Sequence, residues 1–141
     1  MRVFLDANIL FSAAKSDGAV RELLRLLVEG GHECWVDDYV MIEARRNLSI
    51  KGPDTLGTFE LLLATLHVGS VQAVDPGAQA VAWLPEKDRP VLAAAMRLRC
   101  DVLVTGDRAH FEFGYGKLFG GVTIHSPRSS AKSLSLVQRE E

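Results

Sequence analysis

The chain has 141 residues, of which 48% are hydrophobic and 24% are charged, and its formal net charge is −2. These values are typical of a single globular domain, and no apolar run approaches the roughly 20 residues that a membrane-spanning helix needs. Asp6 and Asn8 interrupt the first apolar stretch, which argues against a secretion signal and favours a cytoplasmic protein. The net charge by itself argues against a polyanionic partner.

The two cysteines, Cys34 and Cys100, show no C-x-x-C spacing, and each lies among apolar residues. Such cysteines are typical of buried free thiols. We therefore predict neither a disulfide nor a zinc site for this chain.

The hydrophobic pattern predicts strands that alternate with helices. In chain order it predicts a strand at 2–5, a helix at 18–31, a strand at 33–36, a helix through 39–48, a helix that starts between 53 and 57 and stops at 69, a strand at 71–74, a short helix at 78–84, a helix at 91–98, and strands at 101–104 and 122–125. This alternation predicts an α/β fold with a mostly parallel sheet, covered on both faces, whose ligands gather at the carboxyl ends of the strands. We expect one domain over residues 1–127 and a polar C-terminal tail over 128–141, either mobile or folded as a short surface helix.

Four acidic residues occupy positions from which they could reach one point. Asp6 and Asp107 directly follow predicted buried strands, Asp88 precedes the helix at 91–98, and Glu43 lies within a helix. Carboxylates that lie so close repel one another unless a cation joins them, and hard divalent ions such as Mg²⁺ or Mn²⁺ prefer oxygen ligands. The pattern therefore predicts a site for one or two such ions, which would suit hydrolysis of a phosphodiester. Neutralising these four acids would leave 16 basic against 14 other acidic groups, since 18 minus four is 14.

Neutral and basic side chains lie beside these acids in the sequence. Asn8 and Thr105 are oxygen donors that could orient a ligating carboxylate or a water. Arg46, Arg89 and Arg108 could contact phosphates on either side of a cleaved bond, although such arginines are more often part of a solvated surface.

Each acid also has a purely structural interpretation. Asp6 could cap a turn, Asp88 could cap its helix with about 1 kcal/mol of stabilisation, and Glu43 could form an ion pair across a helical turn. Their joint occurrence favours the shared site. His110 follows Asp107 by three residues and could line that site, but we predict a structural role for it.

Three segments of the sequence resemble the PIN-domain family, whose members include the VapC-like toxin ribonucleases of toxin–antitoxin pairs. The segments are FLDANIL, VMIEARRNL and DRPVLAAAMRLRCDVLVTGD, and the resemblance spans residues 2 to about 125. It implies a three-layer α/β/α sandwich and a ribonuclease that cleaves single-stranded RNA. It also implies that Asp6, Glu43, Asp88 and Asp107 are the catalytic metal ligands, with Asn8 and Thr105 in support. An antitoxin protein and a second copy of the chain, in a homodimer, are the partners it implies.

Three other functions remain open from the sequence. A haloacid-dehalogenase-like phosphatase also begins with an acid at a strand end, but its D-x-D pattern is broken here by Asn8. A response-regulator receiver would need a late lysine at a strand end, and Lys117 lies in a glycine-rich segment instead. A catalytically silent PIN fold that only binds RNA or protein is the alternative from a different class.

Overall fold

The computed structural model describes residues 1–70 and 78–134 and contains one six-stranded sheet in the order β3-β2-β1-β4-β6-β5. The strands are β1 (Arg2–Leu5), β2 (Glu33–Asp37), β3 (His67–Gly69), β4 (Val102–Val104), β5 (Leu118–Phe119) and β6 (Val122–His125). All neighbouring strands pair in parallel except β5 and β6, which are antiparallel. The mostly parallel sheet predicted from the sequence is confirmed.

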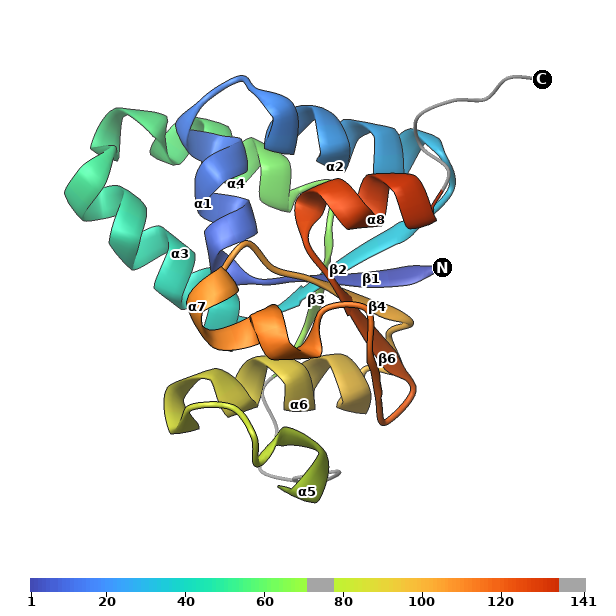
Figure 1. Ribbon diagram of the computed structural model, residues 1–141. Coiled ribbons are helices and arrows are strands. Elements are labelled where there is room, and N and C mark those ends of the chain that lie inside the picture. The colour runs from blue at the N-terminus through green and yellow to red at the C-terminus, as the bar shows by residue number, and fades with distance from the viewer. Residues whose placement is uncertain (71–77, 135–141) are drawn as a thin grey trace.

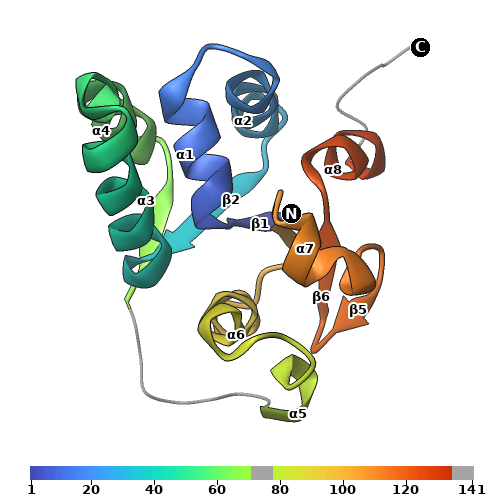
Figure 2. The ribbon, with the colours of Figure 1, turned by 60° about the vertical axis from the view of Figure 1, so that its left-hand side comes forward.

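Helices cover both faces of this sheet. They are α1 (Ala7–Lys15), α2 (Ala19–Glu29), α3 (Asp38–Lys51), α4 (Leu56–Leu63), α5 (Ala78–Val81), α6 (Arg89–Arg97), α7 (Arg108–Phe111) and α8 (Pro127–Ser133), with 3-10 turns η1 (Pro53–Thr55), η2 (Glu86–Asp88) and η3 (Glu112–Gly114). Helices α1 to α4 and α8 lie on one face and α6 lies on the other (Figures 1 and 2). The fold is therefore the three-layer α/β/α sandwich that we expected. Among the described residues, no helix is long and apolar enough to cross a membrane.

The centre of the core is formed by β1 and β4 together with α1. Val3, Phe4 and Leu5 of β1 are fully buried, and the three residues of β4 are also buried. Continuous apolar runs of this kind are typical of a parallel strand that is covered on both faces. Parallel pairing of β1 with β4 places the carboxyl ends of the two strands side by side, with Leu5 opposite Val104.

Helix α1 was not predicted from the sequence. It begins directly after Asp6 and buries Ala7, Ile9, Leu10, Ala13 and Ala14 against its neighbours. It contacts α2, α3 and α4, so much of its surface is covered. Only Asp6 separates this helix from β1, so the apolar residues of the two elements form one nearly continuous run in the sequence.

The secondary structure between residues 53 and 74 also differs from the one predicted from the sequence. The predicted helix ends at Leu63, and residues 67–69 form the edge strand β3, whereas the predicted strand at 71–74 lies outside the described residues. Pairing with β2 holds this three-residue strand, and the ring of His67 stacks on Trp35 with ring centroids 4.9 Å apart. A strand this short has no period that the sequence could display.

Residues Pro127–Ser133 of the C-terminal segment form helix α8. Helix α8 is capped by Ser126, packs against α2 and β6, and buries Ser130. The division at residue 127 stays a prediction, because α8 begins at that residue and continues into the predicted tail.

Cys34 and Cys100 are both free and buried, as predicted. Burial raises the pKa of each thiol to about 12.

Candidate metal centre

Asp6 is fixed by hydrogen bonds at the junction of β1 and α1. Its Oδ1 accepts from the backbone N–H of Ala7 at 2.7 Å, which caps α1, and its Oδ2 accepts from Thr105 Oγ1 at 2.7 Å and from Asn8 Nδ2 at 3.2 Å. Asp6 is only 6% exposed, and Thr105 is completely buried. Two sequence neighbours, Ala7 and Asn8, together with the distant Thr105 thus hold this carboxylate in one orientation.

Asn8 and Thr105 also connect the ends of β1 and β4. Asn8 Oδ1 accepts from the N–H of Gly106 at 2.8 Å, and Thr105 Oγ1 accepts from the N–H of Asp107 at 3.1 Å. Such contacts are typical of residues that orient a ligating carboxylate. We call Asp6, Asn8 and Thr105 the fixed corner of the site.

The pKa of Asp6 is raised to about 6, chiefly because burial removes the carboxylate from water. The hydrogen bonds from Thr105 and Ala7 lower it, while the negative charges of Glu43 and Asp88 raise it further. The carboxylates are therefore close enough to oppose one another's ionisation.

Asp88 and Asp107 meet at the imidazole of His110. His110 Nδ1 lies 2.9 Å from Asp88 Oδ2 and 2.9 Å from Asp107 Oδ2. Only the contact with Asp107 has hydrogen-bond geometry, and one ring nitrogen carries at most one proton. These residues each offer a ligand atom, and the three atoms lie within 4.8 Å of one another. A structural role was predicted for His110. Its ring lies between two of the predicted acids, so the residue also belongs to the acidic cluster.

Asp88 stands at the N-cap position of α6 but does not cap the helix with its side chain. Its Oδ2 is buried and has no hydrogen-bond partner among the residues that the structure describes. Burial raises the pKa of this carboxyl, although the charges of His110 and Lys87 lower it. The capping interpretation therefore does not account for Asp88.

Glu43 completes the group from α3. All four predicted acids line one cleft of about 240 Å³ at the carboxyl ends of β1 and β4. The full lining consists of Asp6, Asn8, Phe11, Glu43, Asn47, Lys51, Lys87, Asp88 and Asp107. The structure thus brings together acids that are up to 101 positions apart in the sequence, since 107 minus 6 is 101.

A family model described as the PIN domain matches residues 2–109, which include all four acids. The chain belongs to the PIN-domain family. A search among curated proteins found no match.

Solved structures similar to this PIN domain include three protein–DNA complexes. The chain matches VapBC2 from Rickettsia felis bound to a DNA fragment from their promoter with a TM-score of 0.66 and 16% identity, covering 89% of this chain and 98% of that one. It matches FitAB bound to an IR36 DNA fragment with a TM-score of 0.63 and 14% identity, covering 89% and 94%. It matches DNA-bound VapBC from Salmonella typhimurium with a TM-score of 0.63 and 15% identity, covering 90% and 98%. At these identities the likeness concerns the fold.

The three predicted phosphate contacts of this PIN domain lie in different surroundings. Arg46 lines a second hollow beside the cleft. Arg89 donates to the carbonyl oxygens of Leu84 and Ala82, and Arg108 donates to Glu112. Whether any of the three contacts a phosphate stays a prediction, and Arg46 lies beside the carboxylate cleft.

Two lysines in the cleft were missed from the sequence, Lys51 at the end of α3 and Lys87 beside Asp88. The spacing of eight residues between Glu43 and Lys51, about two helical turns, could have indicated Lys51. No local pattern indicates Lys87, because it faces the cleft only once η2 is placed against α3.

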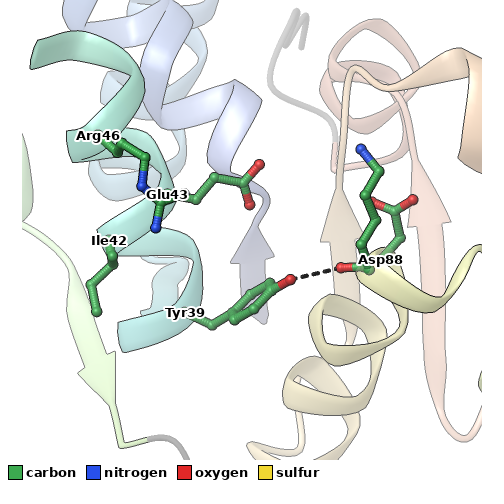
Figure 3. A pocket seen from close by; sticks show the side chains of 6 residues that line it. Tyr39, Ile42, Glu43, Arg46 and Asp88 are labelled. Atoms are coloured by element: carbon green, nitrogen blue, oxygen red, sulfur yellow. Dashed lines mark hydrogen bonds between the residues drawn. The ribbon is translucent and has the colours of Figure 1, made fainter. Parts of the chain in front are cut away.

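The second hollow has a volume of about 290 Å³ and shares Glu43, Lys87 and Asp88 with the cleft. Figure 3 shows Tyr39 and Glu43 projecting from α3 toward the segment that carries Asp88. The hydroxyl of Tyr39 donates to the carbonyl oxygen of Lys87 at 2.8 Å. This bond connects α3 to the residue directly before Asp88.

The residues of the cleft fit a divalent cation. Asp88 Oδ2 has a contact with His110 that lacks hydrogen-bond geometry, and the charges of Glu43 and Asp88 add to the effect of burial in raising the pKa of Asp6, so negative charge gathers in the cleft. Carboxylate oxygens are the ligands that Mg²⁺ and Mn²⁺ prefer. Asp88, Asp107 and His110 offer ligand atoms close enough together to share such an ion, and Asp6 and Glu43 line the same cleft.

Proposed function

We propose that this PIN domain is a metal-dependent endoribonuclease that cleaves phosphodiester bonds of single-stranded RNA, and that it is the toxin of a toxin–antitoxin pair. The observation that carries the proposal is the single cleft lined by Asp6, Glu43, Asp88 and Asp107. Membership of the PIN-domain family supports nuclease chemistry over the phosphatase alternative.

The four acids would hold one or two Mg²⁺ or Mn²⁺ ions, which when bound activate a water and stabilise the charge that develops on the phosphate. The fixed corner keeps the Asp6 carboxylate oriented before a cation or substrate arrives, because Thr105 and Asn8 both donate to its Oδ2. Arg46, Lys51 and Lys87 supply positive charge at the cleft and the second hollow. They would bind RNA phosphates on either side of the bond that is cleaved.

The toxin role has separate support from the solved structures. Two of the three similar structures are VapBC complexes from Rickettsia felis and Salmonella typhimurium. We infer from this likeness an antitoxin partner, a homodimer and action in the cytoplasm for the present chain. Co-purification with the product of a neighbouring small gene would test the antitoxin, and light scattering would test the dimer.

The first experiment is cleavage of a mixed-sequence single-stranded RNA by the purified chain with Mg²⁺ or Mn²⁺. We expect cleavage that EDTA abolishes and that Asp6→Asn lacks. Asp54→Asn is the matched control, since Asp54 is an exposed acid on η1 away from the cleft, and it should cleave like the unaltered chain. Intact RNA with both metals and several substrates would instead favour a catalytically silent binding module.

A further inference from the structure

The second hollow differs in chemistry from the carboxylate cleft that it adjoins. It is lined by Tyr39, Ile42, Glu43, Arg46, Lys87 and Asp88, so an aromatic ring and an aliphatic side chain lie beside two cations. The cleft itself is dominated by carboxylates and amides. The second hollow therefore offers an apolar surface next to the place where we expect the scissile phosphate.

The apolar side chains of this hollow are exposed without serving the core. Tyr39 is 36% exposed and Ile42 is 51% exposed, although α3 buries Val40, Ala44 and Leu48 on its inner side. The hydroxyl of Tyr39 is occupied by the Lys87 carbonyl, and this bond fixes the ring between α3 and the Asp88 segment (Figure 3). A ring held in this way can present a face to a planar ligand at little cost in side-chain entropy.

The two cations of the hollow are available to an anion. Arg45, which precedes Arg46, is paired with Glu60 at 2.9 Å. Within residues 1–70 and 78–134, neither Arg46 nor Lys87 forms an ion pair of this kind. Lys87 lines both the hollow and the cleft, so the phosphate backbone of one RNA strand could lie across the two.

We infer that the second hollow is a binding subsite for the nucleotide next to the scissile phosphate, with its base against Tyr39 and Ile42 and its phosphate near Arg46 and Lys87. This inference rests on the proposed ribonuclease function and specifies how that site takes its substrate. Bases of single strands stack on aromatic side chains while basic residues follow the backbone. A base within a duplex is already stacked and paired, so the subsite also gives a reason for a single-strand preference.

The test measures binding of a fluorescent single-stranded RNA to the full chain carrying Asp6→Asn, with Mg²⁺ present, by fluorescence anisotropy. We expect Tyr39→Ala in this background to raise Kd by about 5- to 150-fold, the effect of losing one base–aromatic stack. Tyr39→Phe keeps the ring and should retain most of the affinity. Phe113→Ala is the matched control, because Phe113 is a 68% exposed aromatic outside the hollow, and it should leave Kd unchanged.

A scan of the RNA with single abasic positions identifies the base that enters the hollow. We expect one sensitive position, next to the cleavage site that is mapped with the unaltered chain. Removal of the base at this position should weaken binding when Tyr39 is present. It should have no further effect in Tyr39→Ala. Arg46→Gln should reduce the slope of log K against log salt by about 0.7, and Arg45→Gln should not.

The outcomes separate this inference from the proposed function. The chain with Tyr39 could cleave RNA and yet bind every abasic RNA as tightly as the complete one. That result would overturn the subsite alone. An unchanged Kd for a folded Tyr39→Ala protein would do the same. Failure of the unaltered chain to cleave or bind any single-stranded RNA would overturn both.

Discussion

Asp6 and Asp88 both line the cleft, but the protein holds their carboxylates in different ways. Asp6 is 6% exposed, and its two oxygens accept hydrogen bonds from Ala7, Thr105 and Asn8. Asp88 leaves a buried Oδ2 without a hydrogen-bond partner among the described residues. One carboxylate is thus oriented by three hydrogen bonds, whereas the buried oxygen of the other meets the imidazole of His110 at 2.9 Å without hydrogen-bond geometry.

This difference indicates where a cation would act on the structure. The fixed corner joins the ends of two central strands and needs no ion to keep its geometry. The opposite side consists of α3 and the η2 turn, which are connected by the bond from Tyr39 to Lys87. We expect a bound cation to stabilise this second side more than the first.

The largest expected effect is the loss of cleavage in Asp6→Asn and in Asp88→Asn. Each removes a predicted metal ligand, and losses at residues that only support a ligand already reach 10- to 100-fold. We therefore expect each variant to lower kcat/KM for RNA by more than about 100-fold. Retention of activity by either variant would remove that residue from the metal site.

The dependence of the free energy of unfolding on pH tests whether burial raises the pKa of Asp6. Its pKa of about 6 exceeds the usual 3.8, so the folded chain binds this proton more tightly than the unfolded chain does. The carboxyl therefore stabilises the fold below about pH 4, and this stabilisation is lost as the pH rises through 6. The shift corresponds to about 3 kcal/mol.

Urea unfolding in EDTA at pH 4 and pH 7 measures this loss. Between the two values the unaltered chain should lose about 2 kcal/mol relative to Asp6→Asn, which has no titrating group there, because the unfolded carboxyl is already partly ionised at pH 4. Parallel pH profiles for the two proteins would show that Asp6 is not perturbed by burial.

Metal-dependent stabilisation distinguishes the two sides of the cleft. At a concentration 100 times its Kd, an ion that binds only the folded chain adds about 2.7 kcal/mol to the free energy of unfolding. We expect Mn²⁺ to stabilise the unaltered chain in this way and to have little effect on Asp88→Asn. Without metal, Asp88→Asn should be no less stable than the unaltered chain, since burial disfavours the ionised form of Asp88 and His110 keeps its contact with Asp107. Calorimetric melting with and without EDTA measures both quantities.

Substitution of Thr105 tests the fixed corner, because a bound metal cannot replace the hydrogen bonds of this side chain. Thr105→Val keeps the shape of the side chain but removes the donor to Asp6 and the acceptor for Asp107, which should cost about 1–3 kcal/mol of stability. It should also raise the pKa of Asp6 further, because the hydrogen bond from Thr105 lowers it. Thr105→Ser keeps the hydroxyl and is the control for the hydrogen bonds. Equal stabilities for Val and Ser at this position would contradict the importance of the corner.

The smallest effect is expected at Arg108, outside both sides of the cleft. Its ion pair with Glu112 is exposed, with side-chain exposures of 75% and 62%, so water screens the attraction between the two charges. Urea unfolding should therefore show almost the same free energy of unfolding for Arg108→Gln as for the unaltered chain. We expect the KM for RNA to rise less in Arg108→Gln than in Arg46→Gln. An equal rise would support the predicted contact of Arg108 with a phosphate.

The sequence by itself determined the fold class and the positions of the acids at the ends of strands. Buried strands such as RVFL and VLV display their apolar character locally, so the residues that follow them, Asp6 and Asp107, could be placed at one edge of the sheet. The membership of the PIN-domain family was also readable from short segments around these acids. These features depend on neighbours in the chain, which a sequence displays directly.

Other features were decided only by the tertiary structure. Helix α1 follows β1 after a single residue and shares one apolar run with it, so only the fold divides the two, and β3 exists because β2 pairs with it. His110 lies against Asp88, and Tyr39 reaches Lys87, across 22 and 48 positions of the chain respectively. Such contacts join elements whose relative placement is set by packing of the whole core, and no local pattern of residue types records them.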